Sequence, residues 1–316
     1  MKKAFEKLNL RDYGVLLGFL ALCIAISIAT PSFLGKQNIL NLLRQSSIIG
    51  IISAGMTFVI ISGNFDISVG AVAALAGAIT MKFATGGTNL FASMLLGVAI
   101  CAVIGLINGI VVAKINVPSL IATMAMVTIV RGLLLMLTGG YPITENIPIL
   151  DYIGNGYLFN IPIPVVIFFI VVLVSFIVLN KTKFGRYVYS VGGNQEASKL
   201  NGINVDSHKV KVFIINAVLA GIAGIVLTGR LGTATAIAGE GYDMDAIASV
   251  VIGGTSVAGG SGSVLKTVIG VLLMSVINNS FNLLGIDVYF QYIFKGLIIL
   301  AAVGFDSYSK KKLASR

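Results

Sequence analysis

The stretch LFASMLLGVAICAVIGLINGIVVA, residues 90–113, contains 24 residues in a row without a charged side chain. At a rise of about 1.5 Å per residue, a helix of this length covers about 36 Å, more than the roughly 30 Å hydrocarbon core of a bilayer. A helix satisfies its backbone hydrogen bonds within its own segment, as lipid requires. Residues 90–113 therefore predict a membrane-spanning helix.

Similar apolar segments recur along the whole chain. The ten candidate spans cover residues 13–30, 45–62, 67–81, 90–113, 118–139, 161–180, 212–231, 246–265, 267–284 and 288–305. The segment 67–81 is short, 118–139 contains Arg131, and glycine pairs interrupt 246–265. We therefore expect some of these helices to be broken or re-entrant. The predicted fold is an all-α polytopic membrane protein with about ten transmembrane helices.

The composition excludes a soluble globular protein. Of the 316 residues 57% are hydrophobic and 11% are charged, and the mean hydropathy is +0.98, whereas soluble domains carry about 25% charged residues. We expect a single transmembrane domain over residues 1–316, without a soluble catalytic domain. The net charge of +10 comes from basic residues at the ends of spans, where anionic lipid and topology account for them. Membrane lipid is an expected partner and nucleic acid is not.

The distribution of Lys and Arg predicts the orientation, because short cytoplasmic loops carry the excess of basic residues. With the amino terminus inside and ten spans, sixteen basic residues fall inside, three outside and three within spans. The outside set is Lys36, Arg44 and Lys82, and the set within spans is Arg131, Arg230 and Lys295. We therefore expect both termini and residues 181–211 in the cytoplasm, with residues 140–160 outside.

Three short matches indicate an internal repeat. The first half carries FDISV, ING and RGL at residues 65–69, 107–109 and 131–133; the second carries YDMDA, INN and KGL at 242–246, 277–279 and 295–297. The offsets are 177, 170 and 164 residues, or five spans. Because five is odd, matching segments would cross the membrane in opposite directions, as in the inverted repeats of transporters. We expect two five-helix halves, about residues 13–150 and 161–306.

The centre of the charged loop 181–211 reads GGNQEASKLNGI, residues 192–203. Asn194 can cap a helix, Glu196 would lie in its first turn, where the helix dipole favours an anion, and Gly202 can end it. A helix of about eight residues does not persist alone in water, so we expect it to dock on a partner. The alternative is a solvated loop that only sets the topology.

Several stretches taken together resemble the permease subunit of ribose-type ABC importers. They are NILNLLRQ at 38–45, GMTFVI at 55–60, DISVG at 66–70, FGR at 184–186, GGN at 192–194, GYDMDAIA at 241–248, VIGGTS at 251–256 and GGSG at 259–262. The resemblance runs from about residue 31 to 306 and implies the fold of type II ABC importer permeases. Asn64 and Phe65 depart from the pattern, which has a second glycine and an aliphatic residue there, and this leaves the exact sugar open.

The resemblance implies a permease of the bacterial inner membrane that receives a monosaccharide from an extracytoplasmic sugar-binding protein, with ribose as the favoured sugar. It implies a dimeric pore, which we expect to be a homodimer with a second copy of this chain. It also implies a separate cytosolic ATP-binding cassette ATPase, coupled through residues 192–203. The expected coupling residues are Gly193, Asn194, Glu196, Ala197, Leu200 and Gly202.

The sequence also indicates, independently of the resemblance, that another chain binds ATP. The phosphate-binding motif G-x-x-x-x-G-K-[ST] is missing, since Leu265 precedes Lys266-Thr267. The carboxylates, Asp66 and Asp245 among them, map to loops or span ends, whereas ion-coupled carriers often need buried ionisable groups. We expect no catalytic residue, metal or cofactor, and thus a transporter subunit rather than an enzyme. The alternative function is an ATP-independent secondary carrier or facilitator for a small polar solute.

A polar stripe on the 267–284 span is the expected substrate pathway. The stripe consists of Ser275, Asn278, Asn279 and Asn282, at positions i, i+3, i+4 and i+7. These side chains can hydrogen-bond sugar hydroxyls or can pair across a helix interface, and both interpretations stay open. Asn108 is the inverted counterpart, where Gly105 and Gly109 form a GxxxG pattern that favours packing. We expect Arg131 and Lys295 to snorkel or to pair with carbonyls.

Overall fold

The computed structural model describes residues 10–314; expectations about the residues outside this range, such as the cytoplasmic Lys2, Lys3 and Lys7, lie outside the described residues. The described chain is built from helices joined by short connections. The helices are α2 (Leu10–Ala29), η1 (Pro31–Leu34), α3 (Lys36–Ile61), α4 (Val69–Thr85), α5 (Leu90–Ala113), α6 (Ser119–Thr138), α7 (Pro148–Asn155), α8 (Ile163–Lys181), α9 (Lys183–Gly193), α10 (Gln195–Leu200), α11 (Val205–Leu231), α12 (Tyr242–Ile252), α13 (Val264–Leu283) and α14 (Val288–Ala314).

The predicted all-α polytopic fold is confirmed, and each predicted span overlaps one helix, except that 246–265 covers most of α12 and also reaches the start of α13. Within residues 10–314, six helices are long and apolar enough to cross a membrane, namely α3, α5, α6, α8, α11 and α13, and shorter apolar helices lie in α2, α4 and α14. The span predicted at 246–265 corresponds to α12, whose 11 residues cover about 16 Å, half of a hydrocarbon core. Because α12 ends directly before Gly253, the expected interruption of this span is confirmed.

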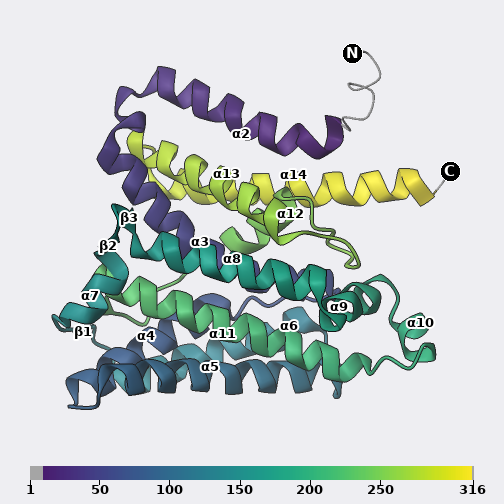
Figure 1. Ribbon diagram of the computed structural model, residues 1–316, viewed down its shortest axis with the longest axis horizontal. Helices are drawn as coiled ribbons and strands as arrows, with labels where there is room; N and C mark the ends of the chain where they lie inside the picture. Colours follow the sequence, from purple (N-terminus) through teal and green to yellow (C-terminus); the bar gives the residue numbers. More distant parts are fainter. Residues whose placement is uncertain (1–9, 315–316) are drawn as a thin grey trace.

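Most of the long helices lie side by side with their axes roughly aligned (Figure 1). At one end, which we call the α7 end, α7 lies beside two short antiparallel strand pairs, β1 (Ile143–Thr144) with β4 (Thr233–Ala234) and β2 (Tyr157–Leu158) with β3 (Ile161–Pro162). At the other end, the α9 end, lie α9 and α10 (Figure 1). The start of α2 and the last turns of α14 point to the α9 end (Figure 1), as an even number of crossings requires.

The central helix is α11, which packs against α3, α4 and α5. Glycines allow this close approach, since a Cβ on Gly105 of α5 would lie 2.6 Å from the Phe213 carbonyl oxygen, and one on Gly109 would lie 2.7 Å from the Val210 Cα. Gly105 and Gly109 therefore pack α5 onto α11, as the GxxxG pattern predicted.

Two non-helical segments enter the bundle. Residues 62–68 connect α3 to α4, and residues 232–241 connect α11 to α12 with only the short strand β4 between them. Gly239 of the second segment meets Gly70 in the first turn of α4; both are buried, and a Cβ on Gly239 would lie 2.6 Å from the Gly70 carbonyl oxygen. The first turns of α4 and α12 consequently lie close together inside the protein, where irregular backbone is shielded from lipid.

Candidate functional site

The predicted docking helix is formed by α10, which projects at the α9 end (Figure 1). The Asn194 side chain caps it, accepting a hydrogen bond from the Ala197 amide at 2.9 Å, so the predicted cap is confirmed. Gly202 follows the helix with φ +77°, the left-handed backbone expected of a helix stop. Ser198 faces inward and lies 2.8 Å from the Ser190 hydroxyl of α9, so α9 and α10 form one packed unit.

The outer surface of this unit is free of contacts within the described chain. Leu200 is 90% exposed, although it is a large apolar residue. Glu196 and Lys199 form an exposed ion pair with 3.6 Å between nitrogen and oxygen, which contributes little stability by itself. Single exposed apolar side chains are common on protein surfaces, so this exposure shows only that α10 is accessible to another chain.

Glycines connect α9 to the ends of two other elements. The amide of Gly260, in the loop after α12, donates to the Ile61 carbonyl at the end of α3 at 2.8 Å. Gly192 of α9 lies directly against both, since a Cβ on it would be 2.7 Å from the Gly260 nitrogen. The Tyr189 hydroxyl also donates to the Gly262 carbonyl, at 2.9 Å. We call Ile61, Gly192 and Gly260 the glycine junction; the sequence patterns did not predict this contact.

Asp66 forms a buried polar cluster between α4, α5 and α11. Its carboxylate accepts hydrogen bonds from the Ser68 amide at 2.9 Å, the Ser68 hydroxyl at 2.6 Å and the Asn216 amide at 2.9 Å. Asn108 donates to the same Ser68 hydroxyl at 3.1 Å. Asp66 is 1% exposed, so its position in a loop does not place it in water, contrary to the sequence-based expectation.

Asp245 forms a second buried cluster, between α12, α13 and α14. Lys295 of α14 lies 2.9 Å from one oxygen of its carboxylate and 3.1 Å from the other. Asn278 of α13 is close enough to influence the same carboxylate. The expectation that Lys295 snorkels or pairs with carbonyls is therefore wrong, because its partner is a carboxylate. Arg131 behaves as predicted and donates to the carbonyl oxygens of Ala236 and Ala238.

The four residues of the polar stripe do not face one common space. Asn279 pairs with Asn38 of α3 through two hydrogen bonds of 2.8 and 3.0 Å, and Asn282 accepts from Gln291 at 3.2 Å. Ser275 and Asn278 are buried, and the Ser275 hydroxyl and the Asn278 carbonyl oxygen have no hydrogen-bond partner among the described residues. Asn279 thus has the contacts of a helix-packing residue, while Ser275 and Asn278 keep unused polar atoms.

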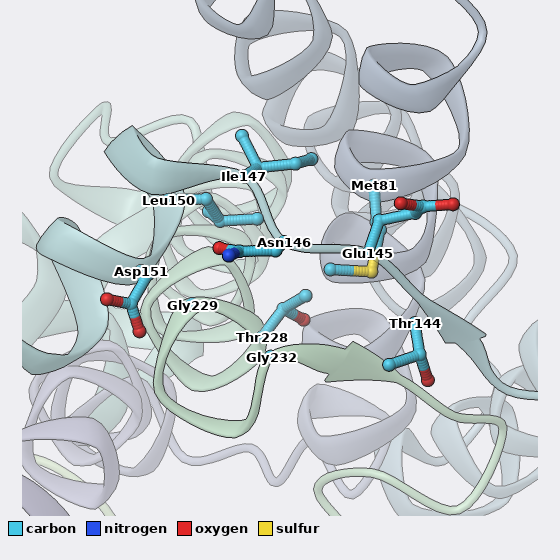
Figure 2. A pocket seen from close by; sticks show the side chains of 10 residues that line it. All are labelled: Met81, Thr144, Glu145, Asn146, Ile147, Leu150, Asp151, Thr228, Gly229 and Gly232. Atoms are coloured by element: carbon cyan, nitrogen blue, oxygen red, sulfur yellow. The ribbon is translucent and has the colours of Figure 1, made fainter.

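A small hollow of about 190 Å³ opens at the α7 end, between α4, α7 and α11. Figure 2 shows Met81 and Thr228 on either side of it, the Asn146 amide on the side of Leu150, and Thr144 and Asp151 at opposite edges. Met81 and Leu150 are each 1% exposed and close it toward the protein interior. The hollow therefore does not lead into the membrane-spanning bundle.

Comparison with known proteins places the chain in a family. The model of the family described as the permease component of branched-chain amino acid transport systems matches residues 38–303. The chain belongs to this family of permeases. The ribose import permeases of Haemophilus influenzae and Bacillus subtilis are 44% and 43% identical to it, over 93% and 94% of this chain and 94% and 93% of theirs. The L-arabinose transport system permease of Escherichia coli is 35% identical over 95% of this chain and 92% of its own. No solved structure matches the permease.

Membership of this family sets the class of activity. The permease is the multi-pass membrane subunit of an ABC importer and a transporter component, not an enzyme. Such a system includes an ATPase and a substrate-binding protein, and in a bacterium it lies in the inner membrane. Among the described residues, no group of three or more His, Cys, Asp and Glu side chains could hold a metal ion. His208 instead packs against the rings of Phe184 and Tyr187.

Proposed function

We propose that the permease imports a monosaccharide, with ribose as the favoured substrate. An extracytoplasmic binding protein delivers the sugar, and a cytosolic ATPase drives its passage across the membrane. The observation that carries the proposal is the identity of 44% to a ribose import permease over nearly the full length of both chains. Relatives named for xylose and L-arabinose transport match at 34% and 35%. Pentoses, rather than branched-chain amino acids, are therefore the substrates favoured by the similarity.

The exposed surface of α9 and α10 is our proposed contact for the ATPase, through Gly193, Asn194, Glu196, Ala197, Leu200 and Gly202. The exposed Leu200 and the absence of any packed neighbour over Glu196 within the described chain support this assignment. The glycine junction then gives a route for motion, because α9 touches both the end of α3 and the loop after α12. A push on α10 would reach α3 and α12 through this contact.

We also propose that residues 13–150 and 161–306 are inverted halves. At the repeat offsets of 177 and 170, Ser68 and Asn108 correspond to Asp245 and Asn278. Asn108 of α5 hydrogen-bonds Ser68 at the start of α4, and the equivalent residues Asn278 and Asp245 lie in α13 and in the first turn of α12.

The proposed assembly is a homodimer with both termini in the cytoplasm. The α7 end would then face outward, toward the binding protein, and the α9 end would face the ATPase. Glu240 supports a second copy, because this exposed carboxylate lies beside the exposed apolar residues Met124 and Ile237. A carboxylate facing lipid is costly, whereas a partner copy would shield it from lipid and leave it facing the space between the two chains. Asn108, Ser275 and Asn278 remain proposed pathway residues, and Asn279 and Asn282 would support them from the helix interfaces.

The test is uptake by proteoliposomes that contain the permease, its ATPase and the binding protein. We expect ATP-dependent uptake of ribose, weaker uptake of xylose or arabinose, and none of leucine. Uptake of leucine alone would contradict the substrate, and sugar uptake by the permease without the ATPase would favour the secondary carrier. For the topology, a Lys199→Cys variant should resist membrane-impermeant thiol reagents in intact cells; labelling there would overturn the orientation.

A further inference from the structure

We propose that a hollow between α4, α6, residues 232–241 and α12 binds a neutral monosaccharide during its passage through the membrane. The inference rests on the proposed function and adds a location and a recognition chemistry to it. The hollow has a volume of about 620 Å³, within the range of about 300–1,000 Å³ typical of small-molecule sites. The lining side chains that carry the argument are Ile67, Thr128, Arg131, Glu240, Asp243 and Tyr292.

The hollow lies at membrane depth. Arg131 is 12 residues after Ser119, the start of α6, and 7 residues before its end at Thr138, which places it about 18 Å and 10 Å from the two ends of the helix. Gly70 and Gly239, where the start of α4 meets the segment 232–241, also line the hollow. In secondary transporters, substrates bind at such places, near the bilayer midplane and beside the broken helices of the two halves.

Arg131 holds the wall of the hollow in place. Its Nη1 donates to the carbonyl oxygens of Ala236 and Ala238, so it fixes the non-helical segment that carries Glu240. The charges of Glu240 and Asp243 are close enough to act on the guanidinium. Arg131 is therefore a positioning residue, and the acidic side chains are the groups left to meet a ligand.

The lining favours hydroxyl groups over a carboxylate. Glu240 is exposed to the hollow and Asp243 is partly exposed, and their oxygens accept hydrogen bonds from sugar hydroxyls. The Thr128 hydroxyl can donate or accept, and the Tyr292 ring and Ile67 offer apolar surface for the carbon skeleton. Two carboxylates against one guanidinium leave an excess negative charge, which repels the carboxylate of an amino acid. A neutral pentose meets no such repulsion.

The first test asks whether the hollow contains water, and it does not depend on transport. A Thr128→Cys variant, made in a background with Cys23→Ser and Cys101→Ala, is treated in proteoliposomes with a small charged thiol reagent. Ile129→Cys is the matched control, because Ile129 is the next residue of the same helix, is 55% exposed and does not line the hollow. We expect labelling at 128 at least tenfold faster than at 129, slowed when ribose-loaded binding protein and ATP are present. Equal or absent labelling at 128 would overturn the proposal.

The second test measures selectivity. Glu240→Gln and Asp243→Asn remove charge at constant size, and each should lower ribose uptake about tenfold and change the ratio of ribose to xylose uptake. Glu145→Gln is the control, because Glu145 lines the hollow at the α7 end instead, and it should keep the ratio of ribose to xylose uptake. Unchanged rate and ratio in the two variants would contradict the site, as would loss of uptake with an unchanged ratio. Failure of the unmodified permease to import any pentose would contradict the proposed function instead.

Discussion

Replacing Gly192 by alanine should separate the permease from its ATPase. Gly192 is the residue of α9 that touches both other members of the glycine junction. A Cβ there would lie 2.7 Å from the Gly260 nitrogen and 2.8 Å from the Ile61 carbonyl carbon, and closer still to the Ile61 oxygen. All three are backbone atoms, so no side-chain rotation can relieve the overlap. The new methyl group must push α9 away or break the 2.8 Å hydrogen bond from Gly260 to Ile61.

The size of the effect follows from these two costs. Overpacking by one carbon costs about 1–3 kcal/mol, and leaving a buried amide and carbonyl unpaired costs about 1–3 kcal/mol. The two costs do not add in full, because a shift of α9 that relieves the overlap also reduces the need to break the hydrogen bond. We therefore expect Gly192→Ala to lower the free energy of unfolding by about 2–4 kcal/mol. Gly18→Ala, in α2, is the control, because a Cβ there would meet nothing within 4 Å. That variant should change stability by less than about 0.5 kcal/mol.

The assay compares ATP hydrolysis with and without ribose-loaded binding protein in reconstituted complexes. Gly192→Ala should keep basal hydrolysis and assembly but lose most of the stimulation and the uptake, whereas Gly18→Ala should keep all four. Thermal unfolding in detergent gives the stability of each variant. If Gly192→Ala shows the same stimulation and the same melting temperature as Gly18→Ala, the junction does not transmit the motion and our reasoning about it is wrong.

Three further changes test other contacts. Glu196→Lys reverses the charge at the start of α10 and should abolish stimulated hydrolysis and uptake together while membrane insertion stays normal; unaltered ATP-dependent uptake would show that α10 is not the coupling contact. Lys295→Met leaves Asp245 buried without its partner and should lower stability by about 3–5 kcal/mol, with partial rescue by adding Asp245→Asn; no change in melting temperature would refute the buried pair. Asn279→Leu removes both hydrogen bonds to Asn38 and should lower stability by about 1–3 kcal/mol without changing the ratio of ribose to xylose uptake, whereas an altered ratio would place Asn279 in the pathway.

The sequence alone determined where most of the helices are and that the 246–265 span is interrupted. The segment 118–139, which was also expected to be broken or re-entrant because it contains Arg131, is instead one continuous helix, α6. Apolar runs such as residues 90–113 correspond to α5 with the same bounds, because the length and hydropathy of one segment decide whether it can cross a bilayer. The glycine pair at 253–254 ends α12 where it was expected to, and Asn194 caps α10. Each of these features depends on residues within a few positions of one another, so one chain is enough to predict them.

The sequence could not determine what the polar residues touch. Asp66 was assigned to a loop, yet its side chain is buried and accepts a hydrogen bond from Asn216, 150 residues away. Asn279 was placed on a polar stripe, yet it pairs with Asn38, 241 residues away. Periodicity tells which side chains share a face of one helix but not which helix covers that face.

The hollow with Arg131, Glu240 and Asp243, and the junction of Gly192 with Ile61 and Gly260, were decided only by tertiary structure. Each brings together backbone or side chains from three separate segments. Such contacts arise from how helices and broken segments pack against one another in space, and that packing depends on the volumes and shapes of all neighbours at once. No local sequence pattern predicts these contacts.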